Sequence, residues 1–90
     1  MGKEPRYVSD RGHAFVIVGR DNCPWCDKVK ELLDKVYCTY AYVNLTNHPE
    51  ERARLVEAGI NTVPQVYHHG SRIGGYEQTL RYLTDAGIDV

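Results

Sequence analysis

The chain has 90 residues, of which 42% are hydrophobic and 26% charged, and its formal net charge is −1 at pH 7. This length predicts a single domain over residues 1–90, with the composition of a soluble globular protein. The near-neutral charge gives no reason to expect a nucleic-acid or membrane partner. No apolar run approaches the ~20 residues of a membrane-spanning helix.

The chain contains three cysteines, and its polar first stretch, residues 1–12, shows no apolar segment of the kind found in secretion signals. An odd cysteine count without such a signal argues against a framework of structural disulfides and favours a reducing compartment. We therefore expect a cytoplasmic protein. In that setting a Cys-x-x-Cys pair is more often redox-active or metal-binding than structural.

The first predicted elements form a strand–helix–strand unit. Residues 1–12, with breakers at Pro5 and Gly12, are interpreted as a polar lead-in with room for fraying and for a short extended piece at 7–8. The continuous apolar run 14–18 predicts a strand that is buried on both faces. A helix follows, because apolar side chains then recur at spacings of three, four and three residues: Cys26, Val29, Leu33 and Val36.

A second β-rich run at 37–45 predicts a strand parallel to the first, since a βαβ unit has a right-handed crossover. The next helix is expected to begin with Asn47 as its cap, with Pro49 in its first turn and Glu50 placed as in a capping box. Two apolar residues are expected to face inward from this helix and a glycine to end it: Ala53, Val56 and Gly59.

The last third of the chain predicts an antiparallel hairpin and a helix. A strand at 65–68, a Gly-bearing turn at 69–71 and a short strand from Arg72 make up the hairpin. The final helix carries three inward side chains and ends at a glycine: Tyr76, Leu80, Leu83 and Gly87. The order β-α-β-α-β-β-α predicts an α/β fold, in which a four-stranded mixed sheet is flanked by three helices on its two faces.

The stretch Cys23-Pro24-Trp25-Cys26 carries the candidate chemistry. Because proline suits the first helical position, Cys23 falls at about the N-cap, where its sulfur can accept free backbone N–H groups. Those groups, the helix dipole and the charge of Arg20 favour the thiolate. Cys26 lies one turn further in and should be less exposed. We therefore assign Cys23 as the nucleophile and Cys26 as the resolving thiol.

Two other interpretations of the pair are weaker. A zinc site would need two more ligands, yet the chain has no second Cys-x-x-Cys and its histidines are scattered. Two cysteines that merely pack in a helix would not explain the proline between them or the strand directly upstream. Cys38 is interpreted as a small residue at a strand edge, with a regulatory or intermolecular thiol as the alternative. The histidines are interpreted as surface residues: His13, His48, His68 and His69.

At this point the sequence resembles a known family, the glutaredoxins. Three motifs in the expected order and spacing carry the resemblance: Cys23-Pro24-Trp25-Cys26, Thr62-Val63-Pro64-Gln65-Val66 and Ile73-Gly74-Gly75-Tyr76-Glu77. The similarity extends from about residue 13 to 86 and implies the thioredoxin fold. That fold agrees with the order of elements read from the sequence.

The resemblance also implies a glutathione-binding site. Pro64 is expected to follow a cis peptide bond and to lie beside Cys23, and the backbone of Val63, next to Thr62, is expected to pair with an extended substrate peptide. The backbone of Tyr76 and Glu77, after Gly75, would bind the γ-glutamyl carboxylate at a helix N-terminus. Two side chains complete this site, a cation facing the glycine carboxylate and an aromatic wall: Arg20 and Trp25.

Two positions depart from the family's pattern. Glu77 stands where the family usually has aspartate, and Glu51 stands where a basic or amide residue is usual. If Glu51 faced the groove it would repel the glycine carboxylate, and Arg52 would have to compensate.

Together these features predict a dithiol, glutathione-dependent thiol–disulfide oxidoreductase. It is expected to act as a monomer, with glutathione as reducing co-substrate, no metal, and disulfide-bearing client proteins. The alternative is a glutaredoxin-like electron donor for ribonucleotide reductase that a thioredoxin-reductase-type flavoenzyme reduces. A third class of function, an iron–sulfur carrier, is disfavoured because Pro24 follows Cys23 and a second thiol stands at Cys26.

Overall fold

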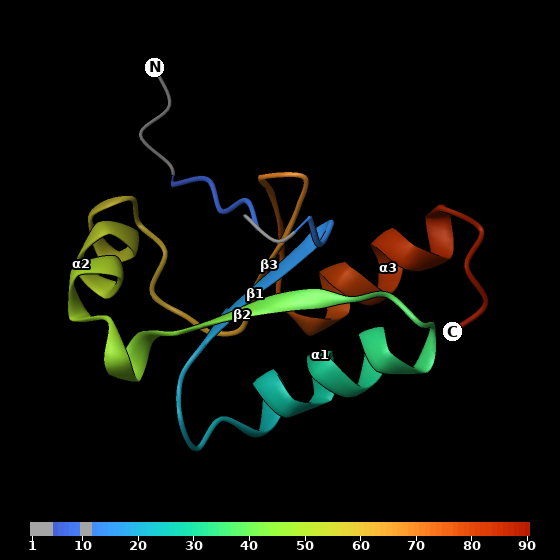
Figure 1. The fold of residues 1–90 in the computed structure, drawn as a ribbon, viewed down its shortest axis with the longest axis horizontal. Helices are drawn as coiled ribbons and strands as arrows, with labels where there is room; N and C mark the ends of the chain where they lie inside the picture. Colours follow the sequence, from blue (N-terminus) through green and yellow to red (C-terminus); the bar gives the residue numbers. More distant parts are fainter. Residues whose placement is uncertain (1–4, 10–11) are drawn as a thin grey trace.

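The computed structural model describes residues 5–9 and 12–90. Strands and helices alternate through the first two thirds of the chain, and a hairpin and a helix follow (Figure 1). The elements are β1 (Phe15–Gly19), α1 (Pro24–Lys35), β2 (Tyr40–Asn44), the 3-10 turn η1 (Leu45–Asn47), α2 (Pro49–Glu57), β3 (Gln65–His68), β4 (Ser71–Gly74) and α3 (Tyr76–Asp85).

The four strands form one mixed sheet in the order β2-β1-β3-β4. β1 runs parallel to β2 and antiparallel to β3, and β4 is antiparallel to β3. The hairpin turn places His69 and Gly70 at φ angles of 51° and 86°, a left-handed pair that suits a two-residue connection between strands. The predicted order of elements and the mixed four-stranded sheet are confirmed.

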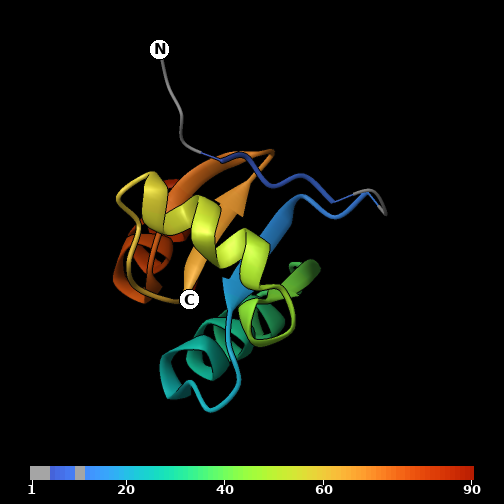
Figure 2. The same cartoon turned by 90° about the vertical axis from the view of Figure 1, so that its left-hand side faces the viewer.

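Helices cover both faces of this sheet (Figures 1 and 2). α1 and α3 pack together on one face, over a core that includes Ile17, Leu33 and Leu83. The other face is covered by α2 and by part of the lead-in, over a core that includes Val18 and Leu55. β1 contributes to both cores and is buried at every residue, as its continuous apolar run predicted.

The start of α2 differs from the prediction. His48 and not Asn47 is its N-cap, and Asn47 is the last residue of η1. Asn44 caps this turn instead, since its side chain accepts from the N–H of Thr46 at 3.0 Å. Pro49 does occupy the first turn of α2, as predicted.

The buried face of α2 was also predicted wrongly. Ala53 and Val56 are exposed, and Leu55 is the buried residue of this helix. The apolar positions of α2 are too few to define a stripe, so the packing of the helix on the sheet decided which one points inward. Gly59 follows the helix with φ of 84°, as expected of a residue that ends it.

The strand predicted at 37–45 is shorter than expected, and the extended piece predicted at 7–8 does not form a strand. β2 begins at Tyr40, because Tyr37 follows α1 with φ of 60° and is 94% exposed. In the lead-in no strand forms at residues 7–8, but Tyr7 is buried and its ring packs edge-on against Tyr67 at 4.8 Å between centroids. Residues 1–4 and 10–11 of the lead-in lie outside the described residues.

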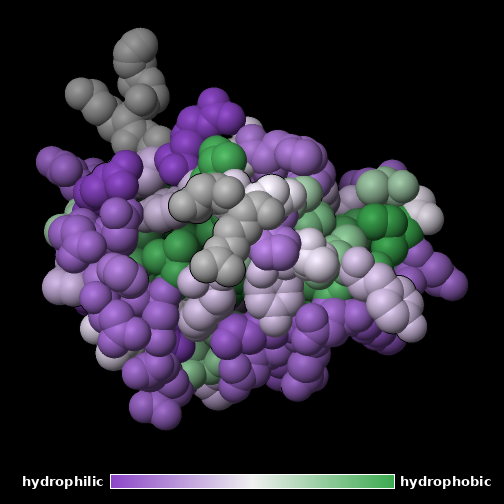
Figure 3. All heavy atoms as spheres, viewed as in Figure 1, coloured by the Kyte–Doolittle hydropathy of each residue, from purple (hydrophilic) through white to green (hydrophobic). Residues whose placement is uncertain are grey.

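The face of the molecule seen in Figure 3 is mostly hydrophilic, with hydrophobic atoms in separate patches. Among residues 5–9 and 12–90, no helix has the length and apolar character needed to cross a bilayer.

Candidate redox site

The N-terminus of α1 holds the two cysteines of the redox pair. Cys23 and Cys26 form a disulfide with their Cα atoms 5.2 Å apart. Cys23 is the N-cap, as predicted, and its Sγ accepts from the backbone N–H of Cys26 at 3.2 Å. In this oxidised form both side chains are buried, with exposed fractions of 5% for Cys23 and 1% for Cys26. The helix end therefore already directs a hydrogen-bond donor at the sulfur that is predicted to be the nucleophile.

Gly19, at the end of β1, lets Cys26 sit against the sheet. A Cβ atom at this position would lie 2.7 Å from Cys26 Sγ and would also collide with the hydroxyl of Tyr42. That hydroxyl donates to the carbonyl of Arg20 at 3.2 Å. Burial, followed by the nearby negative charge of Asp27, raises the pKa of Tyr42, so the group stays a neutral donor. Gly19 belongs to none of the three motifs, and its close approach to Cys26 and Tyr42 joins different elements, which spacing along the chain does not show.

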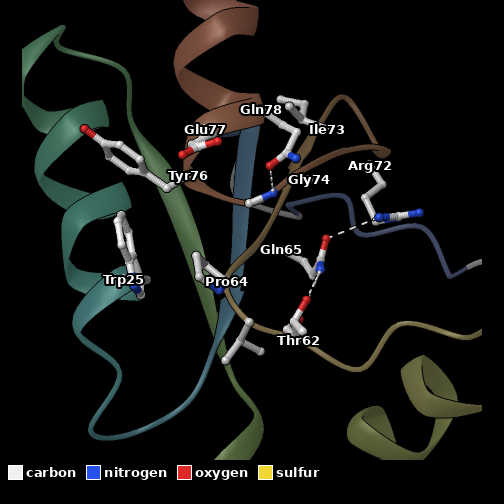
Figure 4. Close-up of a pocket in the computed structure, with 12 residues that line it drawn as sticks. Trp25, Thr62, Pro64, Gln65, Arg72, Ile73, Gly74, Tyr76, Glu77 and Gln78 are labelled. Carbon is white, nitrogen blue, oxygen red and sulfur yellow. Dashed lines mark hydrogen bonds between the residues drawn. The ribbon is translucent and has the colours of Figure 1, made fainter.

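The Val63–Pro64 peptide bond is cis, as the resemblance implied. The side chain of Gln65 secures the loop that leads into it. Its Nε2 donates to the carbonyl and the hydroxyl of Thr62 at 3.0 and 3.2 Å, and its Oε1 accepts from Arg72 at 3.4 Å (Figure 4). That Pro64 contacts Cys23 directly stays a prediction.

A pocket of about 500 Å³ lies between this loop and the N-terminus of α3. On one side Trp25 and Tyr76 face each other, with ring centroids 5.5 Å apart, and Trp25 is 52% exposed (Figure 4). Seven of the nine residues predicted to bind glutathione line it: Trp25, Thr62, Val63, Pro64, Gly75, Tyr76 and Glu77. Because Trp25 stands between the two cysteines, the redox pair lies at the edge of this pocket.

The first turn of α3 has no side-chain cap. Gly75 is the N-cap, and its own backbone is tied into the helix. Its N–H donates to Gln78 Oε1 at 3.0 Å, and its carbonyl accepts from the hydroxyl of Thr79 at 2.8 Å. The N–H groups that open the helix are thus left to the pocket, which suits an anion.

The two predicted cations line a neighbouring pocket of about 460 Å³ on the α2 side. Arg20 and Arg52 contribute to it, and Thr62 and Val63 line both pockets, so the two pockets are neighbours at this loop. Arg20 Nη1 donates to the carbonyls of Asp21 and Asn22 at 2.9 and 2.7 Å, and no hydrogen bond joins it to the disulfide. The charge of Arg20 is therefore placed at the pocket and the loop before Cys23.

Glu51 does not line either pocket. Its Oε1 accepts from the hydroxyl of Tyr7 at 2.8 Å and from Arg54 at 2.9 Å. Burial and this hydrogen bond raise the pKa of Tyr7 well above its usual range, which keeps the hydroxyl a donor to the carboxylate. The repulsion that Glu51 would cause in the groove does not arise, since its charge is engaged by Tyr7 and Arg54.

Several residues of the pockets were not predicted. Gln65, Arg72, Ile73, Gly74 and Gln78 line the pocket beside α3. Gln65, Ile73 and Gly74 stand within the motifs that carry the resemblance, although no role was assigned to them. Gln78 stands three residues after the helix cap, where a side chain can return to the cap N–H. Arg72 had no local signal. Within residues 5–9 and 12–90, no three histidine, cysteine or acidic side chains gather in a way that could hold a metal ion.

A disulfide at a helix N-terminus, a cis-proline loop and a mixed sheet in the order β2-β1-β3-β4 define a thioredoxin-fold oxidoreductase. The family model for glutaredoxin matches residues 15–73. Glutaredoxin from Ricinus communis is 37% identical over 83 residues, which cover 88% of this chain and 79% of that protein. Glutaredoxin 1 of Rickettsia typhi is 30% identical over 80 residues, which cover 86% and 77%.

Among solved structures, the buckwheat glutaredoxin–glutathione complex superposes with a TM-score of 0.72 and 27% sequence identity, over 82% of this chain and 71% of that one. The chain belongs to the glutaredoxin family. It is a thiol–disulfide oxidoreductase with a Cys23–Cys26 redox pair, on the thioredoxin fold.

Proposed function

We propose that this glutaredoxin uses glutathione to reduce protein disulfides and the mixed disulfides that glutathione forms with proteins. The observation that carries the proposal is the pocket beside the redox pair, which joins Trp25, the cis-proline loop and the uncapped end of α3. A cysteine-containing peptide with a carboxylate at its amino side would fit there. The glutathione complex of the buckwheat relative supports the choice of this tripeptide.

In the proposed complex glutathione lies extended across the loop. Its γ-glutamyl carboxylate binds the N–H groups of Tyr76 and Glu77 at the end of α3. The backbone of its cysteine pairs with Val63, and its glycine carboxylate points to Arg20 and Arg52 on the α2 side. This direction follows from the pockets, because the helix end and the two cations lie on opposite sides of the loop.

The proposed chemistry is a series of thiol–disulfide exchanges. In the first, the thiolate of Cys23 attacks one sulfur of a disulfide, a mixed disulfide with Cys23 forms, and the other sulfur leaves as a thiolate. When the bound partner is a protein, the thiolate of Cys26 attacks Cys23 and releases the second thiol, which yields the observed pair. Two molecules of glutathione then reduce that pair. The first forms a mixed disulfide with Cys23 and frees Cys26, and the second attacks this mixed disulfide, frees Cys23 and leaves as glutathione disulfide.

A second candidate is a donor to ribonucleotide reductase that a flavoenzyme reduces. Because Glu51 and Glu77 depart from the family's pattern for a glutathione site, they keep this candidate open, but Glu51 is held by Tyr7 and Arg54 away from the pockets. Only Glu77, which lines the pocket at α3, still favours it. Ribonucleotide reductase remains a proposed client of the glutathione-driven enzyme.

We also propose a cytoplasmic location, because the free thiol Cys38 suits a reducing compartment.

The test offers each reductant separately to the oxidised protein. We expect turnover of a glutathionylated protein with glutathione, NADPH and glutathione reductase, and little with thioredoxin reductase. Turnover with thioredoxin reductase alone would contradict the proposal and support the second candidate. Reduction of a ribonucleotide reductase under the same two conditions then asks whether it is a client.

A further inference from the structure

The pocket on the α2 side has an apolar floor. Leu45, Leu55 and Ile60 form this floor and are 8%, 2% and 7% exposed. Val56, on the same side of the pocket, is 47% exposed and so can be reached by a ligand. An apolar surface in a concave site stabilises a ligand that covers it, roughly in proportion to the area removed from water.

Two positive charges stand beside this floor. Arg20 donates through Nη1 to its own loop, which leaves Nε and Nη2 for a ligand. Within the described part of the chain, the guanidinium of Arg52 forms no hydrogen bond or ion pair. An aliphatic side chain with a carboxylate next to it matches both the floor and these cations.

We propose that this pocket is a specificity subsite for the residue that follows the disulfide cysteine of a client protein. The apolar floor binds an aliphatic side chain of that residue, and Arg20 and Arg52 bind a carboxylate beside this side chain. The inference rests on the proposed direction of glutathione, whose own residue after cysteine is glycine and leaves the floor uncovered. The subsite therefore distinguishes clients from the tripeptide that reduces the enzyme, and it favours a cysteine followed by leucine, isoleucine or valine.

The step whose rate depends on this subsite is the attack of Cys23 on the client disulfide. Its thiolate bonds to the sulfur of the client cysteine, the client's disulfide breaks, and its second sulfur leaves as a thiolate. A side chain that reaches the floor holds the client cysteine at Val63, between this pocket and the pocket that Trp25 lines. Its binding energy then appears in the second-order rate constant of this step.

The experiment compares tripeptides that differ only in the third residue. γ-Glu-Cys-Gly, γ-Glu-Cys-Leu and the C-terminal amide of the latter are each attached by a disulfide to one carrier protein. Single-turnover reactions use a Cys26→Ser, Cys38→Ser enzyme, and the fluorescence of Trp25, the one tryptophan in the sequence, reports the reaction. We expect the leucine peptide to react roughly fivefold or more faster than the glycine peptide. Its amide should lose part of that gain.

A matched pair of variants locates the effect. Val56→Asp places a charge at the apolar floor and should bring the leucine-to-glycine ratio close to one. Val8→Asp changes a valine that is 69% exposed and does not line the pocket, so it should leave the ratio unchanged. Circular dichroism of both variants checks that they fold.

Each outcome decides a separate question. Equal rates for the leucine and glycine peptides would overturn the subsite while leaving the proposed function intact. A leucine preference that survives in Val56→Asp would also overturn it, because the preference would then arise elsewhere. Failure of the glycine peptide to react at all would instead contradict the use of glutathione.

Discussion

Two helices, α1 and α3, direct their N-termini at the functional site. The two ends differ in whether a side chain of the protein accepts hydrogen bonds from the first backbone N–H groups. At α1 the N-cap is Cys23, whose sulfur accepts the N–H of Cys26 at 3.2 Å. At α3 the N-cap is Gly75, which has no side chain to accept the N–H groups behind it. One helix end is thus occupied by a reactive atom of the protein itself, and the other is open to the pocket.

This difference explains how one fold can both activate a thiol and bind an anionic peptide. Backbone N–H groups and the helix dipole favour negative charge at either end. When the chain supplies a sulfur, that preference favours the thiolate. When the chain supplies only glycine, the same preference is available to a ligand's carboxylate. The residue at the cap therefore decides whether the helix end contributes chemistry or binding.

Replacing the cysteines at the end of α1 should have the largest effect. Cys23→Ser removes the attacking sulfur and should lower both deglutathionylation and protein-disulfide reduction by roughly 10³-fold or more. Cys26→Ser should keep deglutathionylation, because Cys23 alone can exchange with glutathione, and lose only the reduction of protein disulfides. Steady-state assays with the two substrate types measure this, and equal losses in both variants would refute the assigned roles.

Placing an acceptor side chain at the N-cap of α3 should have the next largest effect on activity. Gly75 has φ of −88°, and a Cβ there would meet Gln78 Oε1 at 3.4 Å, so a side chain fits without backbone strain. In Gly75→Asp the new carboxylate would accept the first N–H groups of α3 and repel the ligand's carboxylate. We expect KM for a glutathione mixed disulfide to rise about tenfold.

The stability of the Gly75→Asp protein should not fall, since aspartate is a good helix cap. Thermal unfolding followed by circular dichroism checks this point. Gly75→Ala serves as the control, because it adds a Cβ atom without a charge or an acceptor. If Gly75→Ala raised KM as much as Gly75→Asp, the effect would be steric and the comparison of the two helix ends would not hold.

The first turn of α1 also depends on room at Gly19. Gly19→Ala would place a Cβ atom 2.7 Å from Cys26 Sγ and against the Tyr42 hydroxyl. We expect the oxidised protein to lose about 1–3 kcal/mol of unfolding free energy in urea, as in other overpacked sites. Adding Tyr42→Phe removes one of the two colliding atoms and should recover part of the loss. Additive losses in the double variant would contradict this.

The smallest expected effect is on the pH dependence of stability, and it comes from His68 of β3, which contacts Tyr82 of α3. A hydrogen bond of 2.5 Å joins His68 Nδ1 and the hydroxyl of Tyr82. The imidazole ring of His68 also stacks on Phe15. Burial and then the neighbouring His69 lower the pKa of His68. The unfolded chain therefore binds this proton more readily, so the stability that His68 contributes is lost as pH falls below about 6.5.

Urea unfolding between pH 8 and pH 5 measures this effect. His68→Gln should flatten the decline of stability toward low pH, whereas Val8→Gln, at an exposed site without a titratable group, should leave it unchanged. A decline that is equally steep in the His68→Gln protein would show that other groups cause it. Activity at the redox pair should be unaffected by either change.

The sequence by itself determined the features that depend on neighbours along the chain. Apolar spacing predicted the order of strands and helices, and Pro24 after Cys23 predicted a sulfur at the N-cap of α1. The three motifs identified the family and, with it, the cis bond at Pro64. Such features are local, because a helix cap or a strand run is set within a few residues.

Only the tertiary structure decided the features that join distant segments. Asn44, and not Asn47, became a cap, since η1 forms before α2 begins. Glu51 turned out to be held by Tyr7 from the lead-in, 44 residues away in sequence. Gly19 proved to be a contact point for Cys26. Sequence spacing cannot show these contacts, because each depends on how separate elements pack over the two faces of the sheet.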